Sequence, residues 1–139
     1  MERIMGLDVG DKTIGVSVSD LLQMTAQGVT TIRRESKEKD YKALEDLIKE
    51  YNIKKVVVGL PKNMNGTLGP QGEKTMKFAE KLKNKFNVQI IYEDERLTTM
   101  AAEKLLIEGD VRREKRKGVI DKVAANFILQ TYLDRQGRV

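Results

Sequence analysis

Three carboxylates that lie far apart in the sequence are placed where a folded chain can bring them together. Asp8 ends an apolar run, Glu95 follows another apolar run, and Asp121 lies between Ile120 and Val123. Carboxylates that converge in this way can hold one or two divalent cations, which activate water and stabilise the transition state of phosphoryl transfer. The sequence therefore predicts an acidic metal site suited to phosphodiester chemistry.

Composition narrows the chemistry further. The chain has 139 residues, with no Cys and no His. This excludes disulfides, thiol nucleophiles, Ser-His triads and the usual zinc ligands. A catalytic metal must therefore bind oxygen ligands, which favours Mg²⁺ or Mn²⁺.

Each acid also has an ordinary structural interpretation. Asp8 can be a turn residue, but strand alternation places it on the face opposite its apolar neighbours, where a carboxylate needs a metal or a donor. Glu95 and Asp121 can each be favoured by the dipole at the start of a helix. Asp94 is an alternative to Glu95 as the third acid.

A run of cations precedes Asp121. It contributes five positive charges in six residues: Arg112, Arg113, Lys115, Arg116 and Lys117. We expect a cationic loop beside the acids that holds phosphates, against the alternative of a solvated loop without function. The net charge of +5 is compatible with a nucleic acid partner, while 5% aromatic residues and no Trp leave little for base stacking.

The first half of the chain predicts strands followed by one helix. Residues 3–9 and 13–19 flank the turn at Gly10 and predict a β-hairpin, and 27–32 predict a third strand. The charged stretch 33–40 is expected to be a solvated loop, and apolar spacing predicts a helix from near Asp40 to Tyr51.

The second half alternates strand and helix. The expected elements are a strand over 55–59, a long loop over 63–72, a helix over 73–86, a strand over 88–92, a helix from Thr98 or Thr99 to Gly109, and a last helix from near Val119. This order predicts one α/β domain with a mixed five-stranded sheet and helices on both faces. It is the order of the ribonuclease H-like fold.

Four motifs resemble one known family. They are the stretch 5–16 around Asp8, Gly59-Leu60-Pro61, the string Asp-Glu-Arg-Leu-Thr-Thr at 94–99, and the stretch 121–125. Together they resemble the YqgF family, whose members are also called RuvX or Holliday junction resolvases. The resemblance covers essentially the whole chain.

The resemblance implies a nuclease that uses Mg²⁺ or Mn²⁺, with Asp8, Glu95 and Asp121 as catalytic acids and metal ligands. It implies one of two tasks: processing of the 5′ end of pre-16S rRNA in ribosome biogenesis, which we expect here, or resolution of branched DNA junctions in recombination and repair. It also implies three phosphate contacts: Lys12, Lys62 and Arg96.

Glu95 requires a particular geometry. The strand 55–59 ends without a carboxylate, so the next strand must supply the third acid. If that strand lies two places from the first, Glu95 starts about 10 Å from Asp8, because neighbouring strands are about 4.8 Å apart. Only a loop that curls inward closes that distance.

Other interpretations stay open. The turn after Asp8 is similar to the phosphate loop of actin-like ATPases, but those folds need two such domains. A non-catalytic nucleic-acid-binding protein is the alternative outside the enzymes. We expect a cytoplasmic protein that does not bind membranes, because no secretion signal or membrane-length apolar run occurs. Ribosomal precursor particles are expected partners, and the expected state is a monomer or a weak homodimer.

Overall fold

The computed structural model describes residues 2–62, 65–94 and 113–136, and for 113–123 it describes the backbone only. The strands are β1 (Arg3–Val9), β2 (Thr13–Ser19), β3 (Ala26–Arg33), β4 (Ile53–Leu60) and β5 (Gln89–Asp94), and the helices are α1 (Lys37–Glu50), α2 (Pro70–Phe86) and α4 (Arg113–Gln136). The five strands predicted from the sequence are all present, within one to two residues at most of their bounds.

The five strands form one mixed sheet in the order β3-β2-β1-β4-β5. β1 pairs antiparallel with β2 and parallel with β4, and β4 pairs parallel with β5. In register, Leu7 lies opposite Val58, which lies opposite Tyr92. β1 is therefore the central strand, and β5 lies two places from it.

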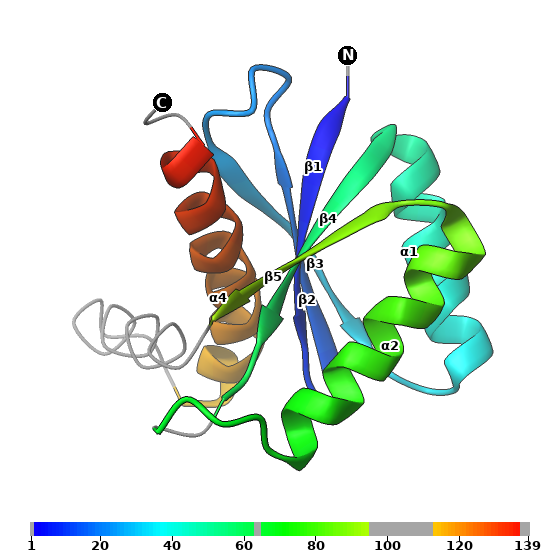
Figure 1. The fold of residues 1–139 in the computed structure, drawn as a ribbon, viewed down its shortest axis with the longest axis vertical. Helices are drawn as coiled ribbons and strands as arrows, with labels where there is room; N and C mark the ends of the chain where they lie inside the picture. Colours follow the sequence, from blue (N-terminus) through cyan, green and yellow to red (C-terminus); the bar gives the residue numbers. More distant parts are fainter. Residues whose placement is uncertain (1, 63–64, 95–112, 137–139) are drawn as a thin grey trace.

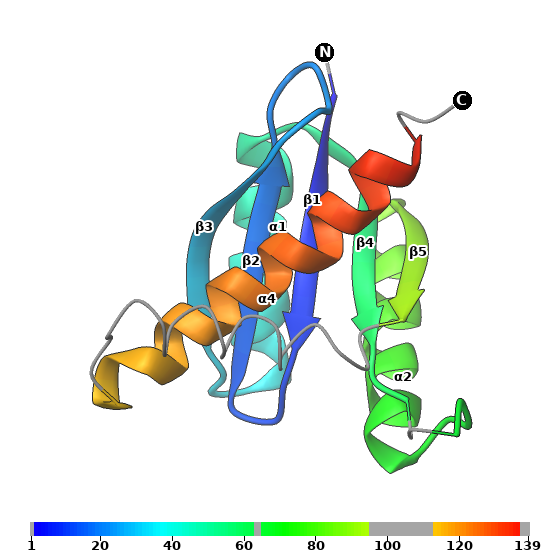
Figure 2. The ribbon, with the colours of Figure 1, turned by 90° about the vertical axis from the view of Figure 1, so that its left-hand side faces the viewer.

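Helices cover both faces of the sheet (Figure 1). α1 and α2 pack on one face over a core that includes Leu7, Val58 and Leu82. α4 crosses the other face obliquely and buries Ile128 and Leu129 against it (Figure 2). Within the described parts of the chain, none of the helices has the length and apolar character needed to span a membrane.

The prediction of a solvated loop over 33–40 was wrong for residues 37–40, which form the first turn of α1, whereas residues 34–36 do form a loop. Ser36 caps α1 by accepting a hydrogen bond from the Lys39 amide at 3.2 Å, so the helix begins at Lys37 rather than near Asp40. Asp40 is only 2% exposed and pairs with Arg34 at 3.0 Å. The stretch therefore contains an ion pair between the buried Asp40 and the half-buried Arg34.

The other helices also begin earlier than their apolar stripes indicate. α2 begins at Pro70, since proline suits the first turn of a helix, where its missing N–H is not needed. α4 begins at Arg113 instead of near Val119. The predicted cationic loop is therefore wrong from Arg113 onward: Lys and Arg are good helix formers, and the backbone there is helical. Arg112 and the helix predicted over 98–109 lie outside the described residues.

Candidate active site

Asp8 lies near the carboxyl end of the central strand β1, which is where open α/β sheets bind ligands. Its neighbours Leu7 and Val9 are buried in the core under α1 and α2. Because side chains alternate along a strand, Asp8 belongs to the opposite face, which α4 covers. Asp8 itself is half-buried.

Gly6 brings α4 close to β1. A Cβ at this position would lie 2.7 Å from the Cβ of Leu129 and 2.6 Å from the hydroxyl of Ser17. That hydroxyl donates a hydrogen bond of 2.9 Å to the carbonyl of Ala125 on α4. The strand that carries Asp8 is therefore held against the helix that carries Asp121.

α4 runs in the opposite sense to β1 (Figure 2). Ile4, near the start of β1, clusters with Leu129 and Leu133, whereas Gly6 contacts Ala125 and Leu129. A step of two residues toward the end of β1 thus corresponds to about one turn toward the start of α4. Asp8 is one such step beyond Gly6.

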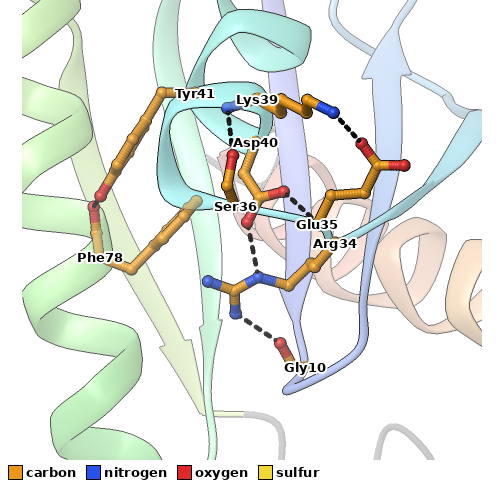
Figure 3. Close-up of polar contacts among 8 residues, drawn as sticks. All are labelled: Gly10, Arg34, Glu35, Ser36, Lys39, Asp40, Tyr41 and Phe78. Carbon is orange, nitrogen blue, oxygen red and sulfur yellow. Dashed lines mark hydrogen bonds and ion pairs between the residues drawn. The ribbon is translucent and has the colours of Figure 1, made fainter.

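The turn that follows Asp8 is held from the other face. The Gly10 amide donates to the carbonyl of Thr13 at 2.8 Å, and the Arg34 guanidinium donates to the Gly10 carbonyl at 2.7 Å (Figure 3). The Arg34 amide also donates to the Lys12 carbonyl at 2.9 Å. Two hydrogen bonds from one arginine therefore fix the backbone just beyond Asp8.

Arg34 is itself oriented by Asp40. Its Nε donates to one carboxylate oxygen of Asp40, and the Glu35 amide donates to the other at 3.2 Å (Figure 3). The Arg34 guanidinium also lies over the Phe78 ring, 5.2 Å from its centroid. Sequence analysis missed this group. A Ser followed by acidic residues, which is typical of a helix start, is the signal that could have indicated that the stretch is ordered.

Tyr41 closes the same region toward α2. Its ring stacks on Phe78 with centroids 4.9 Å apart, and its hydroxyl donates to the Phe78 carbonyl at 3.2 Å (Figure 3). Burial raises the pKa of Tyr41, because the ionised phenolate would lose hydration. The contact joins α1 to α2 beneath the Arg34–Asp40 pair.

A second acidic residue, Glu93, shares the α4 face with Asp8. The register of β4 and β5 places Glu93 opposite Gly59, and Glu93 is only 5% exposed. Its carboxylate accepts a hydrogen bond of 2.7 Å from Arg135 near the end of α4, and this bond raises the pKa of Arg135. The contact between Glu93 and Arg135 thus holds α4 over β5. The two residues are 42 positions apart, so the sequence alone did not indicate that they pair.

The structure describes only part of the predicted acidic set. The backbone of Asp121 lies in α4, and Glu95 lies outside the described residues. Asp94, the alternative to Glu95, is exposed at the end of β5. Among the described side chains, no three acidic residues come close enough to hold a metal ion; the side chains of Glu95 and Asp121 are not among them.

The predicted phosphate contacts are described to different extents. Lys12 is exposed in the turn after Asp8, and Lys62 is half-buried just after β4. Arg96 lies outside the described residues. The cations of the 112–117 run that fall within α4 are described by their helical backbone alone: Arg113, Lys115, Arg116 and Lys117.

One known protein family matches nearly the whole chain. The model of the RuvX family, described as Holliday junction resolvase, matches residues 2–135. The chain belongs to this family.

Two RuvX-type relatives illustrate the similarity. A protein of Caldanaerobacter subterraneus subsp. tengcongensis is 61% identical over 135 residues, which are 96% of this chain and 97% of that protein. A protein of Clostridioides difficile is 62% identical over 132 residues, which are 95% of this chain and 94% of that protein. Both are named as candidate pre-16S rRNA nucleases.

Solved structures share the fold of this RuvX-family chain at low sequence identity. Thermus thermophilus RuvC in complex with a Holliday junction superposes with a TM-score of 0.62 at 12% identity, covering 100% of this chain and 98% of that one. The fowlpox virus Holliday junction resolvase superposes with a TM-score of 0.57 at 16% identity, covering 96% and 99%. The predicted α/β, ribonuclease H-like fold is thereby confirmed.

Proposed function

We propose that this protein is a metal-dependent nuclease that processes the 5′ end of pre-16S rRNA, with Asp8, Glu95 and Asp121 as its catalytic acids. The observation that carries the proposal is the place of Asp8. It lies at the carboxyl end of the central strand of a ribonuclease H-like sheet, on the face that α4 covers. The names of the two relatives described above support the substrate.

The available donors suit a hard divalent cation. Asp8 offers carboxylate oxygen at the strand end, and the chain contains no His or Cys that would favour zinc. When bound by Asp8, Glu95 and Asp121, Mg²⁺ or Mn²⁺ would polarise phosphoryl oxygens and lower the pKa of water. The three carboxylates would hold the cation and orient it toward the scissile phosphate.

The packing of α4 on β1 supports Asp121 as the partner of Asp8. Ala125 accepts a hydrogen bond from Ser17 of β2 and lies next to Gly6 of β1. Asp8 is two residues beyond Gly6 and Asp121 is one helical turn before Ala125, so both steps lead toward the same end of the sheet. This shared direction supports the pairing of Asp121 with Asp8 in the proposed site.

Glu95 can act as the third acid only if the chain after β5 turns back toward β1. β5 lies two places from β1, so its carboxyl end, at Asp94, lies about 10 Å from Asp8 across the sheet. Glu93, two residues earlier, belongs to the α4 face. A loop that turns toward α4 after β5 would bring the Glu95 carboxylate to Asp8.

Cations around this end of the sheet are the proposed phosphate contacts. Lys12 follows β1, Lys62 follows β4, and the cations of the 112–117 run open or precede α4. Arg96, which follows Glu95, is the further proposed contact. Such contacts position the backbone without reading sequence, which fits a substrate chosen by its structure.

A second candidate function is resolution of Holliday junctions. It is favoured by the description of the matching family and by the fold shared with RuvC. Symmetrical cleavage of a four-way junction requires two active sites, and therefore a dimer. Trimming of one RNA end requires only a monomer, on its own or on a ribosomal precursor particle.

Cleavage of both substrates by the purified protein tests the proposal. A pre-16S leader RNA and a four-way DNA junction are incubated side by side with Mg²⁺ or with Mn²⁺. Asp8→Asn is the active-site variant, and Asp46→Asn, an exposed carboxylate of α1, is the matched control. We expect cleavage of the RNA that Asp8→Asn reduces by orders of magnitude and Asp46→Asn leaves intact.

Each contrary outcome identifies an alternative. Paired symmetrical nicks in the junction, without RNA cleavage, would replace the proposal with the resolvase. Normal RNA cleavage by Asp8→Asn would refute the acidic site. Binding of either nucleic acid without cleavage would favour the non-catalytic binding protein. Circular dichroism of both variants separates lost chemistry from lost folding.

A further inference from the structure

A cleft lies on the face of the sheet that α4 does not cover. It has a volume of about 590 Å³ and runs between the start of α1 and the start of α2. The side chains of Tyr41 and Phe78 and the Arg34–Asp40 pair line it (Figure 3). Val9 and Asp11 also line it, so the cleft opens at the end of the sheet where Asp8 lies.

The rim of the cleft is cationic. α1 contributes Lys37, and α2 contributes Lys74, Lys77 and Lys81. The three lysines of α2 are spaced by three and four residues, which places them on one face of the helix. All four lysines are exposed.

Described acidic residues do not neutralise this rim. Of the acids that line the cleft, Asp40 pairs with Arg34 and Glu35 pairs with Lys39, which leaves Asp11. Among the described residues, no acidic side chain forms an ion pair with the ammonium group of any of the four rim lysines. The cleft therefore presents concentrated positive charge beside the predicted catalytic end of the sheet.

We propose that this cleft binds the phosphodiester backbone of the nucleic acid strand next to the cleavage point. The proposal rests on the proposed function and names a part of the substrate site outside the acidic residues. Lys74 and Lys81 are separated by about 10 Å along α2.

The lining of the cleft favours phosphate over base recognition. Phe78, the aromatic residue of α2 that faces the cleft, is 7% exposed and already stacks on Tyr41. Arg34 is engaged by Asp40 and by the carbonyl of Gly10. The groups that remain available are lysine ammonium groups, which contact phosphates without regard to sequence.

The position of the cleft gives the contact a role in substrate placement. Asp8 and Val9 are adjacent in β1 and point to opposite faces, Asp8 toward α4 and Val9 into the cleft region. A strand that passes over the end of β1 can reach the acids on one face while its continuation lies along Lys74, Lys77 and Lys81. The cleft would thus hold a flanking segment and leave the chemistry to the acids.

Two matched triple variants test this contact. Lys74→Gln/Lys77→Gln/Lys81→Gln removes the α2 rim. Lys49→Gln/Lys54→Gln/Lys83→Gln removes the same charge from exposed positions that do not line this cleft. Binding of a labelled single-stranded segment of the pre-16S leader and of the DNA junction is measured by fluorescence anisotropy between 50 and 200 mM salt, with Asp8→Asn added to every protein to prevent cleavage.

We expect the rim variant to lose three phosphate contacts. For a single strand, the slope of log K against log salt should fall by about 2, since each contact contributes about 0.7. This corresponds to about a hundredfold weaker binding at 0.1 M salt if the electrostatic attraction vanishes near 1 M. The control triple variant should keep most of the wild-type slope.

Equal loss of slope in the two triple variants would overturn the proposal, because the effect would then be one of net charge. An unchanged slope in the rim variant, or no binding of either nucleic acid by the parent protein, would also overturn it. Failure of the proposed function is distinguishable. A parent with wild-type Asp8 that never cleaves, but whose binding depends on the rim lysines, would retain the cleft and lose the nuclease.

Discussion

Gly6→Ala is the substitution that most directly tests whether the packing of α4 sets the active site. The added Cβ would lie 2.6 Å from the Ser17 hydroxyl, 2.7 Å from the Leu129 Cβ and 3.1 Å from the Ala125 carbonyl. Contacts this short are not tolerated, and two of the three are with a Cβ or with backbone, which cannot rotate away. The helix must therefore move away from β1 by several tenths of an ångström or more.

The cost of that movement follows from core packing. Inserting a methyl group into a closely packed core costs about 1–3 kcal/mol. For a chain of this size, each kcal/mol lowers the melting temperature by about 3–5 °C, so a decrease of about 3–15 °C is expected. Weakening of the hydrogen bond between Ser17 and Ala125 would place the result in the upper part of that range.

The effect on catalysis should exceed the effect on stability. Asp8 and Asp121 are carried by the two elements that Gly6 brings together, and a displacement of about 1 Å at a catalytic site can cost about 100-fold in rate. Thermal unfolding and RNA cleavage are measured well below the melting temperature. Gly28→Ala, an exposed glycine of β3, is the control. Wild-type melting and wild-type cleavage by Gly6→Ala would refute the reasoning.

Three further predictions concern the surroundings of the site. Asp40→Asn leaves Arg34 without its carboxylate, so the free energy of unfolding measured in urea should fall by about 3 kcal/mol, and an unchanged value would contradict a structural role for the pair. Tyr41 has a raised pKa, so its contribution to stability is complete below about pH 10, where the unfolded phenol is neutral, and is lost as the pH rises further. Tyr41→Phe should therefore flatten the fall of melting temperature above pH 10, and an equally steep fall would exclude Tyr41 as its source. Removal of divalent cations with EDTA should abolish cleavage and lower the melting temperature, because a cation at 100 times its Kd stabilises the fold by about 2.7 kcal/mol; cleavage that persists in EDTA would reject the metal site.

Most of the sheet could be predicted because the relevant signals are local. β1 and β2 flank a glycine turn, and the successive Val56, Val57 and Val58 are typical of a strand buried on both faces. Three strands followed by alternating helices and strands predicted the mixed topology, which the register confirms. These features depend on neighbours within a few residues.

The interactions that were missed join distant parts of the chain. Charge alone made the stretch 33–40 look solvated, because nothing local indicates that Arg34, which pairs with Asp40, also donates to the Gly10 carbonyl 24 residues earlier. Glu93 and Arg135 are likewise brought together only by the passage of α4 over β5. Propensity also placed the helix starts too late, since caps and strong helix formers extend a helix beyond its apolar stripe.

These distant interactions converge on the strand that carries Asp8. On one face, Gly6 and Ser17 set the separation between β1 and α4. On the other, Arg34 holds the turn at Gly10, and its partner Asp40 belongs to the helix that lines the cationic cleft. Asp8 and the cleft with its lysine rim therefore lie on opposite faces of the same short strand, β1. Loss of the lysine rim should consequently weaken nucleic acid binding without moving the acidic residues. A shift of α4, in contrast, should slow cleavage of substrate that still binds. The two faces of β1 therefore contribute separable parts of the proposed activity.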